Sequence, residues 1–142
     1  MIKLYKITDS ATFPTRGTEG AAGYDLYAND SMIIHAGRRA LVGTGISSEF
    51  DDGIVGMIKP RSGLAVKAGI DATGILGGVI DSDYRGEIKV ILINHGTNDF
   101  SVCRGDRIAQ IVFSPCLHNV VEGSGSISET ERGAEGFGHT GE

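Results

Sequence analysis

The stretch that predicts the fold most clearly is IKVILIN, residues 88–94. Its positions 88, 90 and 92 are apolar and spaced by two, and ALVGTGIS, residues 40–47, has the same spacing at 40, 42, 44 and 46. Side chains two residues apart lie on one face of an extended chain, so this spacing predicts strands with one face against a core.

Similar segments rich in Val, Ile and Tyr recur about every ten residues and are separated by Gly or Asp/Asn turns, which is typical of all-β sandwiches, barrels and jelly rolls. The expected strands are Ile2–Thr8, Tyr24–Ala28, Met32–His35, Ala40–Ser47, Ile54–Pro60, Gly77–Ile80, Ile88–Asn94, Asp99–Cys103, Ile108–Ser114 and Leu117–Val121. Only Gly63–Ala68 is expected to form one or two helical turns. The 142 residues suit a single domain.

The composition supports a folded chain with many tight turns. Glycine makes up 22 of the 142 residues, proline only 3, and 40% of the residues are hydrophobic, which excludes a collagen-like or disordered chain. The sequence has no apolar run long enough to span a membrane and no apolar signal segment at its N-terminus. We therefore expect an intracellular, cytoplasmic protein without a membrane partner, and a nuclear location only for a eukaryotic or viral source.

The composition changes after Val121. The segment 122–142 is rich in glycine, and its only hydrophobic side chains are Ile127, Ala134 and Phe137. Such a segment buries too little apolar surface to hold itself in place. The sequence thus predicts a β domain at 1–121 and a flexible tail at 122–142.

Charge and metal-ligand spacing exclude several classes of function. The net charge is −5, with 13 Lys and Arg scattered among 18 Asp and Glu, which disfavours nucleic acid as a partner but allows a small phosphorylated molecule. Cys103 and Cys116 are too far apart for a zinc or redox pair. We expect buried free thiols, although one disulfide could form in a secreted chain. The four histidines lack metal-site spacing.

The tail contains a glycine-rich stretch that could take part in binding or catalysis, RGAEGFGHTG, residues 132–141. It fits the phosphate-loop pattern except that His139 replaces the lysine, and it lacks the strand and helix that flank a true phosphate loop. Arg132 could still bind an anion and Phe137 could cover a base, as parts of a lid over a nucleotide. An unstructured terminus is the alternative.

Four further clusters could bind or activate a ligand. PRSGLA (60–65) offers a cation and a hydroxyl at a turn, or is an ordinary turn into a helix. GGVIDSDYRG (77–86) carries Asp81 and Asp83, which share a side if the backbone is extended and could activate water, or it is a simple hairpin.

In GDRIAQ (105–110), Asp106 and Arg107 are expected to pair with each other, and Gln110 needs hydrogen-bond partners. In AAGYDLYA (21–28), Asp25 is paired with an arginine or bound to a metal.

In chain order, the five stretches AAGYDLYA, PRSGLA, GGVIDSDYRG, GDRIAQ and RGAEGFGHTG resemble the five motifs of the trimeric dUTP pyrophosphatases (dUTPases), over about residues 17–141. The resemblance implies a jelly-roll-like β-barrel assembled as a homotrimer with active sites at subunit interfaces. It also implies Mg²⁺-dependent hydrolysis of dUTP to dUMP and diphosphate, which limits uracil in DNA and supplies dUMP for thymidylate synthesis.

The resemblance assigns roles to individual residues. Asp81 would hold the attacking water, Tyr84 would pack on the deoxyribose, and Asp25 and Gln110 would meet, through water, a Mg²⁺ held mainly by the triphosphate. The α- and β-phosphates would lie against Arg61, Ser62 and Gly63, and the uracil against Gly77, Gly78, Val79 and Ile80. A neighbouring subunit's tail would add Arg132, as a second catalytic residue, together with Phe137, Gly138, His139 and Thr140. His139 stands where many members have serine, and Gly77 where many have alanine.

Three other interpretations stay open at this point. A dCTP deaminase would share the fold, but it needs a glutamate base near the pyrimidine, and GGVIDSDYRG contains none. A jelly roll that only binds dUTP as a signal, or that binds a partner protein, would not need catalytic groups. An unrelated structural jelly roll would leave the ordered motifs unexplained.

Overall fold

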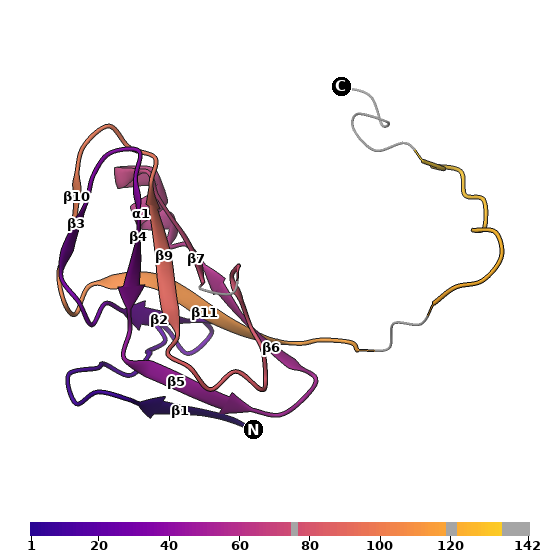
Figure 1. Cartoon of the computed structure of the whole chain (residues 1–142), viewed down its shortest axis with the longest axis horizontal. Coiled ribbons are helices and arrows are strands. Elements are labelled where there is room, and N and C mark those ends of the chain that lie inside the picture. The colour runs from indigo at the N-terminus through magenta and orange to yellow at the C-terminus, as the bar shows by residue number, and fades with distance from the viewer. Residues whose placement is uncertain (75–76, 119–121, 135–142) are drawn as a thin grey trace.

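The computed structural model describes residues 1–74, 77–118 and 122–134 (Figure 1). Within these residues the chain forms strands and one short helix, and every strand pair is antiparallel. In chain order the elements are β1 Ile2–Lys6, β2 Gly23–Tyr27, β3 Met32–Ile34, β4 Arg39–Gly43, β5 Ile46–Phe50, β6 Ile54–Lys59, α1 Ser62–Ala68, β7 Ile70–Gly74, β8 Val79–Ile80, β9 Lys89–Asn94, β10 Phe100–Val102 and β11 Arg107–Pro115.

The strands form four sheets around one core. A four-stranded sheet has the order β2-β11-β6-β8, a three-stranded sheet has the order β4-β9-β7, and the pairs β1-β5 and β3-β10 complete the body. In Figure 1 the β1-β5 pair and the β3-β10 pair lie at opposite ends of the body. The prediction of an all-β, jelly-roll-like fold is confirmed, although the described strands do not form one sheet closed on itself.

The core consists of the residues that the alternating pattern predicts. Along β9, Val90 and Leu92 are fully buried, as is Ile88 just before the strand, whereas the residues between them are partly exposed. Phe50 and Phe113 add an edge-to-face pair, with ring centroids 5.4 Å apart. Burial of an aliphatic side chain stabilises a fold by about 1.5–3 kcal/mol, so these aligned faces hold the sheets together.

Three strand predictions need correction. Ala40–Ser47 is not one strand, because the chain turns at Thr44 and Gly45, leaves the sheet of β4 and enters the pair of β5. Strand β7 was not predicted, because its sequence, IDATG, is short and weakly apolar. Leu117 and His118, expected to begin a strand, lie outside any strand, and residues 119–121 of that segment lie outside the described residues.

The predicted helical turns are confirmed as α1. The helix ends at Gly69, whose left-handed conformation (φ 65°) lets its N–H reach the carbonyls of Leu64 and Ala65. The helix begins directly after Arg61, an extended residue that follows β6. The end of β6 and the start of α1 thus fix Arg61 between two regular elements.

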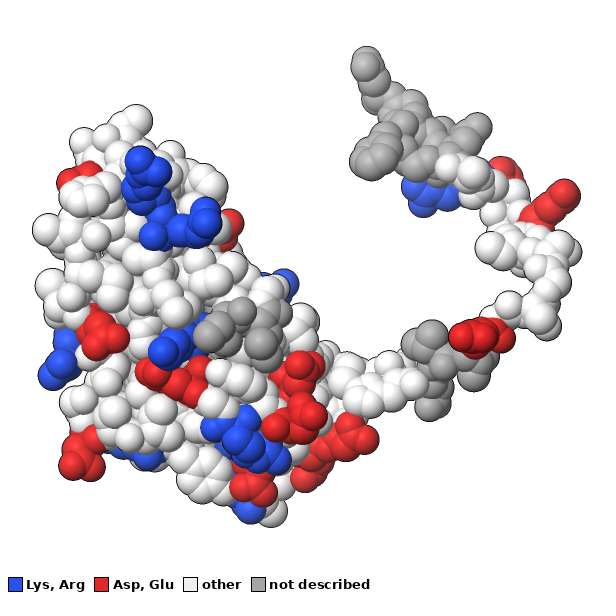
Figure 2. Space-filling view, in the orientation of Figure 1, with Lys and Arg blue, Asp and Glu red and all other residues white. Residues whose placement is uncertain are grey.

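The chain leaves the body after β11. Residues 122–134 form no helix or strand, are exposed, and extend away from the sheets (Figure 1). On the face in Figure 2, the basic side chains stand in separate groups among acidic ones. No helix in the described part of the chain is long and apolar enough to cross a membrane.

The corner at Gly45 yields a stability prediction. Gly45 has φ +67°, and a Cβ there would lie 2.7 Å from both Ala11 Cβ and Thr8 Oγ1. Gly37 has a similar φ, +73°, but open space around it. Gly37→Ala should cost about 1–2 kcal/mol for the left-handed backbone alone, and Gly45→Ala roughly 1–3 kcal/mol more for the clash. Urea denaturation measures both, and equal losses would contradict the packing argument.

Candidate functional site

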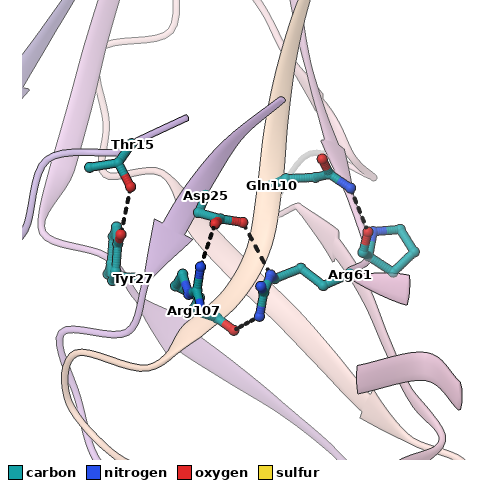
Figure 3. Close-up of polar contacts among 7 residues, drawn as sticks. Thr15, Asp25, Tyr27, Arg61, Arg107 and Gln110 are labelled. Atoms are coloured by element: carbon teal, nitrogen blue, oxygen red, sulfur yellow. Dashed lines mark hydrogen bonds and ion pairs between the residues drawn. The ribbon is translucent and has the colours of Figure 1, made fainter. Parts of the chain in front are cut away.

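The carboxylate of Asp25 binds two arginines from distant parts of the chain. Asp25 Oδ1 accepts a hydrogen bond from Arg61 Nε at 3.1 Å, and Oδ2 pairs with Arg107 Nη1 at 3.4 Å (Figure 3). Arg61 Nη1 also donates to the backbone carbonyl of Arg107 at 3.1 Å. Of the two alternatives for Asp25, the structure shows pairing with arginine.

The strand register explains this cluster. On β11, Gln110 lies opposite Asp25 of β2 on one side and Lys59 of β6 on the other, and Arg61 comes two residues after Lys59. Arg107 opens β11 at an irregularity in the pairing with β2. The predicted pairing of Arg107 with Asp106 is wrong, because Asp106 Oδ2 accepts from the backbone N–H of Cys103 instead, at 2.8 Å.

Gln110 has the partner that its place among apolar residues requires. Its Nε2 donates to the carbonyl of Pro60 at 3.0 Å, directly before Arg61 (Figure 3). Its Oε1 lies above Gly23, where an added Cβ would come within 2.2 Å of it. The absence of a side chain at Gly23 therefore makes room for the Gln110 amide.

The cluster favours an anion. One carboxylate faces two guanidinium groups, so the cluster has a net positive charge. The side chains of Arg61 and Arg107 are 27% and 52% exposed, so a ligand can reach them. Guanidinium groups bind phosphate oxygens in a bidentate manner. A surface hollow lies beside them, lined by Arg61, Leu64, Phe100, Ser101, Gly105, Asp106, Arg107 and Ile108.

Ser62 and Gly63 follow directly as the first residues of α1. Arg61 is the N-cap residue of the helix, and its side chain makes no capping hydrogen bond. The three residues predicted to contact phosphate, Arg61, Ser62 and Gly63, are therefore contiguous at one end of β6.

The second cluster lies at the connection between β7 and β8, where the chain passes from one sheet to another. Gly77 and Gly78 have φ of +73° and +92°, and both donate their N–H to the carbonyl of Gly74. The carbonyl of Gly78 accepts from Ile58 N at 2.8 Å. Val79 is 42% exposed and Ile80 is buried. The glycine backbone thus tightens this connection against β6.

Asp81 and Tyr84 lie on a turn after β8. The N–H of Tyr84 donates to the carbonyl of Asp81 at 3.1 Å, so the backbone is not extended here, and the condition under which Asp81 and Asp83 would share a side is not met. Tyr84 is held by a 3.0 Å hydrogen bond from its hydroxyl to the carbonyl of Glu87. Asp81 is exposed, and no hydrogen bond or ion pair to a described residue engages its carboxylate.

Within one chain the two clusters lie apart. In the sheet, β8 and β2 are at opposite edges, and Arg61 reaches away from β8 toward Asp25 on β2. Along β6, Ile80 lies opposite Gly56, three positions before the last strand residue, Lys59, and Arg61 lies beyond it. At about 3.3 Å per residue, Ile80 is about 10 Å from the end of β6.

The tail motif is only partly described. Arg132 belongs to the segment 122–134, which extends away from the sheets (Figure 1), and it makes contacts of its own there. Phe137, Gly138, His139 and Thr140 lie outside the described residues. Arg107 and Gly23 were not predicted as parts of the first cluster. The glycine next to the Tyr24–Leu26 alternation was the one signal that could have suggested close packing at Gly23.

Comparison with known proteins gives a consistent result. Residues 9–141 match the family model described as dUTPase. The chain is 46% identical over 140 residues to the deoxyuridine 5′-triphosphate nucleotidohydrolase of Nautilia profundicola, covering 99% of this chain and 98% of that protein. It is 48% identical to the enzyme of the same name from Paramecium bursaria Chlorella virus 1, covering 96% and 94%.

Solved structures agree on the fold. The dUTPase of Staphylococcus bacteriophage 80alpha with dUpNHpp superposes with a TM-score of 0.91, at 22% identity, over 99% of this chain and 98% of the phage protein. At that identity the likeness concerns the fold alone.

The packing of Gly23 against Gln110 yields a prediction. In Gly23→Ala the new Cβ must displace the Gln110 amide and break its bond to Pro60, which should lower the free energy of unfolding by roughly 1–3 kcal/mol. Gly20 is the matched control, because nothing lies within 4 Å of an added Cβ there. Gly20→Ala should change stability by no more than about 0.5 kcal/mol. Urea denaturation of both variants checks this, and equal stabilities would refute the packing role of Gly23.

Proposed function

This chain belongs to the dUTPase family, and from that membership we propose that it hydrolyses dUTP to dUMP and diphosphate with Mg²⁺. The observation that carries the proposal is identity of 46–48% to deoxyuridine 5′-triphosphate nucleotidohydrolases over nearly the whole chain. Such an activity would limit uracil incorporation into DNA and would supply dUMP for thymidylate synthesis.

The α- and β-phosphates would be bound by Arg61, in its cluster with Asp25 and Arg107, and by Ser62 and Gly63. Asp25 and the carbonyl of Arg107 already hold the Arg61 guanidinium in place. A preoriented guanidinium loses less side-chain entropy when it binds phosphate, and it stabilises the charge that develops on the phosphate oxygens.

Asp81 would orient the attacking water. The water oxygen attacks the α-phosphorus, the bond from that phosphorus to the α,β-bridging oxygen breaks, and diphosphate leaves. The exposed Asp81 carboxylate is not engaged by a described residue, so it is available to accept a proton from that water.

The segment around β8 would hold the nucleoside. The Gly77–Ile80 segment would face the uracil, and Tyr84 would pack on the deoxyribose and leave no room for a ribose hydroxyl. The bond from the Tyr84 hydroxyl to the Glu87 carbonyl supports this role, because it fixes the ring. A narrow turn with glycines at positive φ would exclude the methyl group of thymine.

The side-chain oxygens of Asp25 and Gln110, near Arg61, suit a Mg²⁺ that is bound mainly by the substrate. The described residues contain no group of three or more His, Cys, Asp or Glu that could hold a metal, and both Asp25 oxygens are bound to arginines. Mg²⁺ keeps several waters and takes few protein ligands beside phosphates. Asp25 and Gln110 would therefore meet the ion through its waters, and the ion would neutralise charge on the triphosphate. A solved dUTPase of phage phi11 of S. aureus coordinates a structural Mg(II) ion.

The complete site would form between copies of the chain in a homotrimer. The water held by Asp81 and the phosphate contacts of Arg61 must meet at one α-phosphorus, within about 3–4 Å. Ile80, directly before Asp81, lies opposite Gly56, about 10 Å before the end of β6, and Arg61 lies beyond that end. This separation supports a site in which Asp81 of one copy faces Arg61 of another.

The segment 122–142 would close over that site as a tail separate from the 1–121 domain. Arg132 would act on the phosphates as a catalytic cation, and Phe137, Gly138, His139 and Thr140 would cover the uracil and the γ-phosphate. The extension of residues 122–134 away from their own body supports a tail that reaches a neighbouring copy (Figure 1).

A product assay tests the function. With Mg²⁺ present, we expect diphosphate release from dUTP, leaving dUMP, and little release from dCTP, dTTP or UTP; removal of Mg²⁺ with a chelator should abolish it. Ammonia from dCTP would replace the proposal with a deaminase. Binding of dUTP without diphosphate release would replace it with a nucleotide sensor.

The role of Asp81 gives a sharper prediction. Asp81→Asn should keep the fold and the binding of dUTP, but it should lower kcat by about 10²–10⁴, because the amide cannot accept the proton. Asp83→Asn is the matched control, as an exposed carboxylate two residues away, and it should retain most of its activity. Steady-state kinetics checks both, and a kcat of Asp81→Asn near that of the parent would remove Asp81 from the mechanism.

A further inference from the structure

Cys116 lies at one end of a chain of three titratable side chains that the proposed reaction does not use. Its Sγ is 3.1 Å from His118 Nε2, and His118 Nδ1 is 3.4 Å from Asp52 Oδ1. The sequence analysis expected both cysteines to be buried, which is wrong, because Cys103 is exposed and Cys116 is partly exposed. Both thiols are free, as expected.

The backbone holds this arrangement in place. The N–H of Cys116 donates to the carbonyl of Gly53 at 2.9 Å, and the N–H of Gly53 donates to Asp52 Oδ1 at 3.0 Å. The turn between β5 and β6 is therefore tied to the end of β11. Cys116 and His118 are two residues apart, which places their side chains on one side, whereas Leu117 between them is 89% exposed.

The order of the three groups favours proton transfer from the thiol. A carboxylate at Nδ1 stabilises the imidazole tautomer that carries its proton there, which leaves the Nε2 lone pair facing Sγ. When Nε2 takes the thiol proton, the imidazolium lies between a thiolate and a carboxylate. Of the nearby charged groups, the Asp51 carboxylate binds the amino group of Met1, and Glu49 on β5 binds Lys3 and the Tyr5 hydroxyl.

We propose that Cys116 is a modification site, a nucleophilic thiol that exchanges with small disulfides. The thiolate attacks one sulfur of the disulfide, the S–S bond breaks, and a mixed disulfide forms at Cys116. The second sulfur leaves as a thiolate and takes the proton from the His118 imidazolium. Cys116 is thus oxidised and the departing thiol is reduced, with no other reactant. The site is independent of the proposed dUTP hydrolysis.

The two cysteines supply a matched pair of variants. Cys103→Ser leaves Cys116 as the only thiol, and Cys116→Ser leaves Cys103, whose thiol has no hydrogen-bond partner among the described residues. The probe is dithiodipyridine, an uncharged aromatic disulfide whose released thione is measured by absorbance. At neutral pH we expect Cys103→Ser to react about tenfold faster than Cys116→Ser, although Cys103 is the more exposed thiol. Equal rates, or a slower Cys116, would overturn the proposal.

His118 is tested as the group that takes the thiol proton. In the Cys103→Ser background, His118→Gln should remove the excess rate, and Asp52→Asn should remove part of it. Imidazole added to the buffer should restore part of the rate lost in the His118→Gln variant, which a purely structural effect would not allow. His35→Gln is the control, because His35 pairs with Asp99 in the same way but has no thiol beside it. An unchanged rate after His118→Gln would refute the proposal.

Discussion

The half-buried carboxylate of Asp25, held between Arg61 and Arg107, is the interaction on which the site depends. It joins β2 to the start of β11 and to the junction of β6 with α1, so one ion-paired carboxylate connects three segments that are distant in sequence. Removing the carboxylate would leave two guanidinium groups facing each other without compensation, which is costly in a partly desolvated place. The excess positive charge of the same cluster makes it suitable for a phosphate chain.

The sheet order constrains how the chain can work. The residues proposed to bind phosphate follow β6, and Arg61 points toward the β2 edge, whereas Asp81 and Tyr84 follow β8 at the other edge. With the proposed roles, a nucleotide bound within one chain would not bring these groups to one phosphorus atom. Assembly is therefore part of the proposed catalytic design, and the tail of 122–142 would add the last groups from a neighbouring copy.

The sequence predicted those parts of the fold that follow from local patterns. Alternation at 88, 90 and 92 matches the buried face before and along β9, and the Gly63–Ala68 segment forms a helix. Pairings between distant residues could not be predicted. Nothing local indicates that Arg107 bonds to Asp25 and not to Asp106, or that Asp52 lies beside His118. The break at Gly45 was missed because the apolar spacing continues across it, although its positive φ turns the chain.

Complementation between two inactive variants tests most directly whether the site forms between chains. Arg61→Gln and Asp81→Asn chains, carrying different tags, are produced together, and the mixed oligomers are purified through both tags. If the site forms between chains, dUTP hydrolysis should recover, because some sites combine the intact Arg61 of one chain with the intact Asp81 of another. Oligomers of Arg61→Gln alone, purified in the same way, should stay inactive. Mixed oligomers without activity would contradict the account, because a site within one chain can never contain both intact residues.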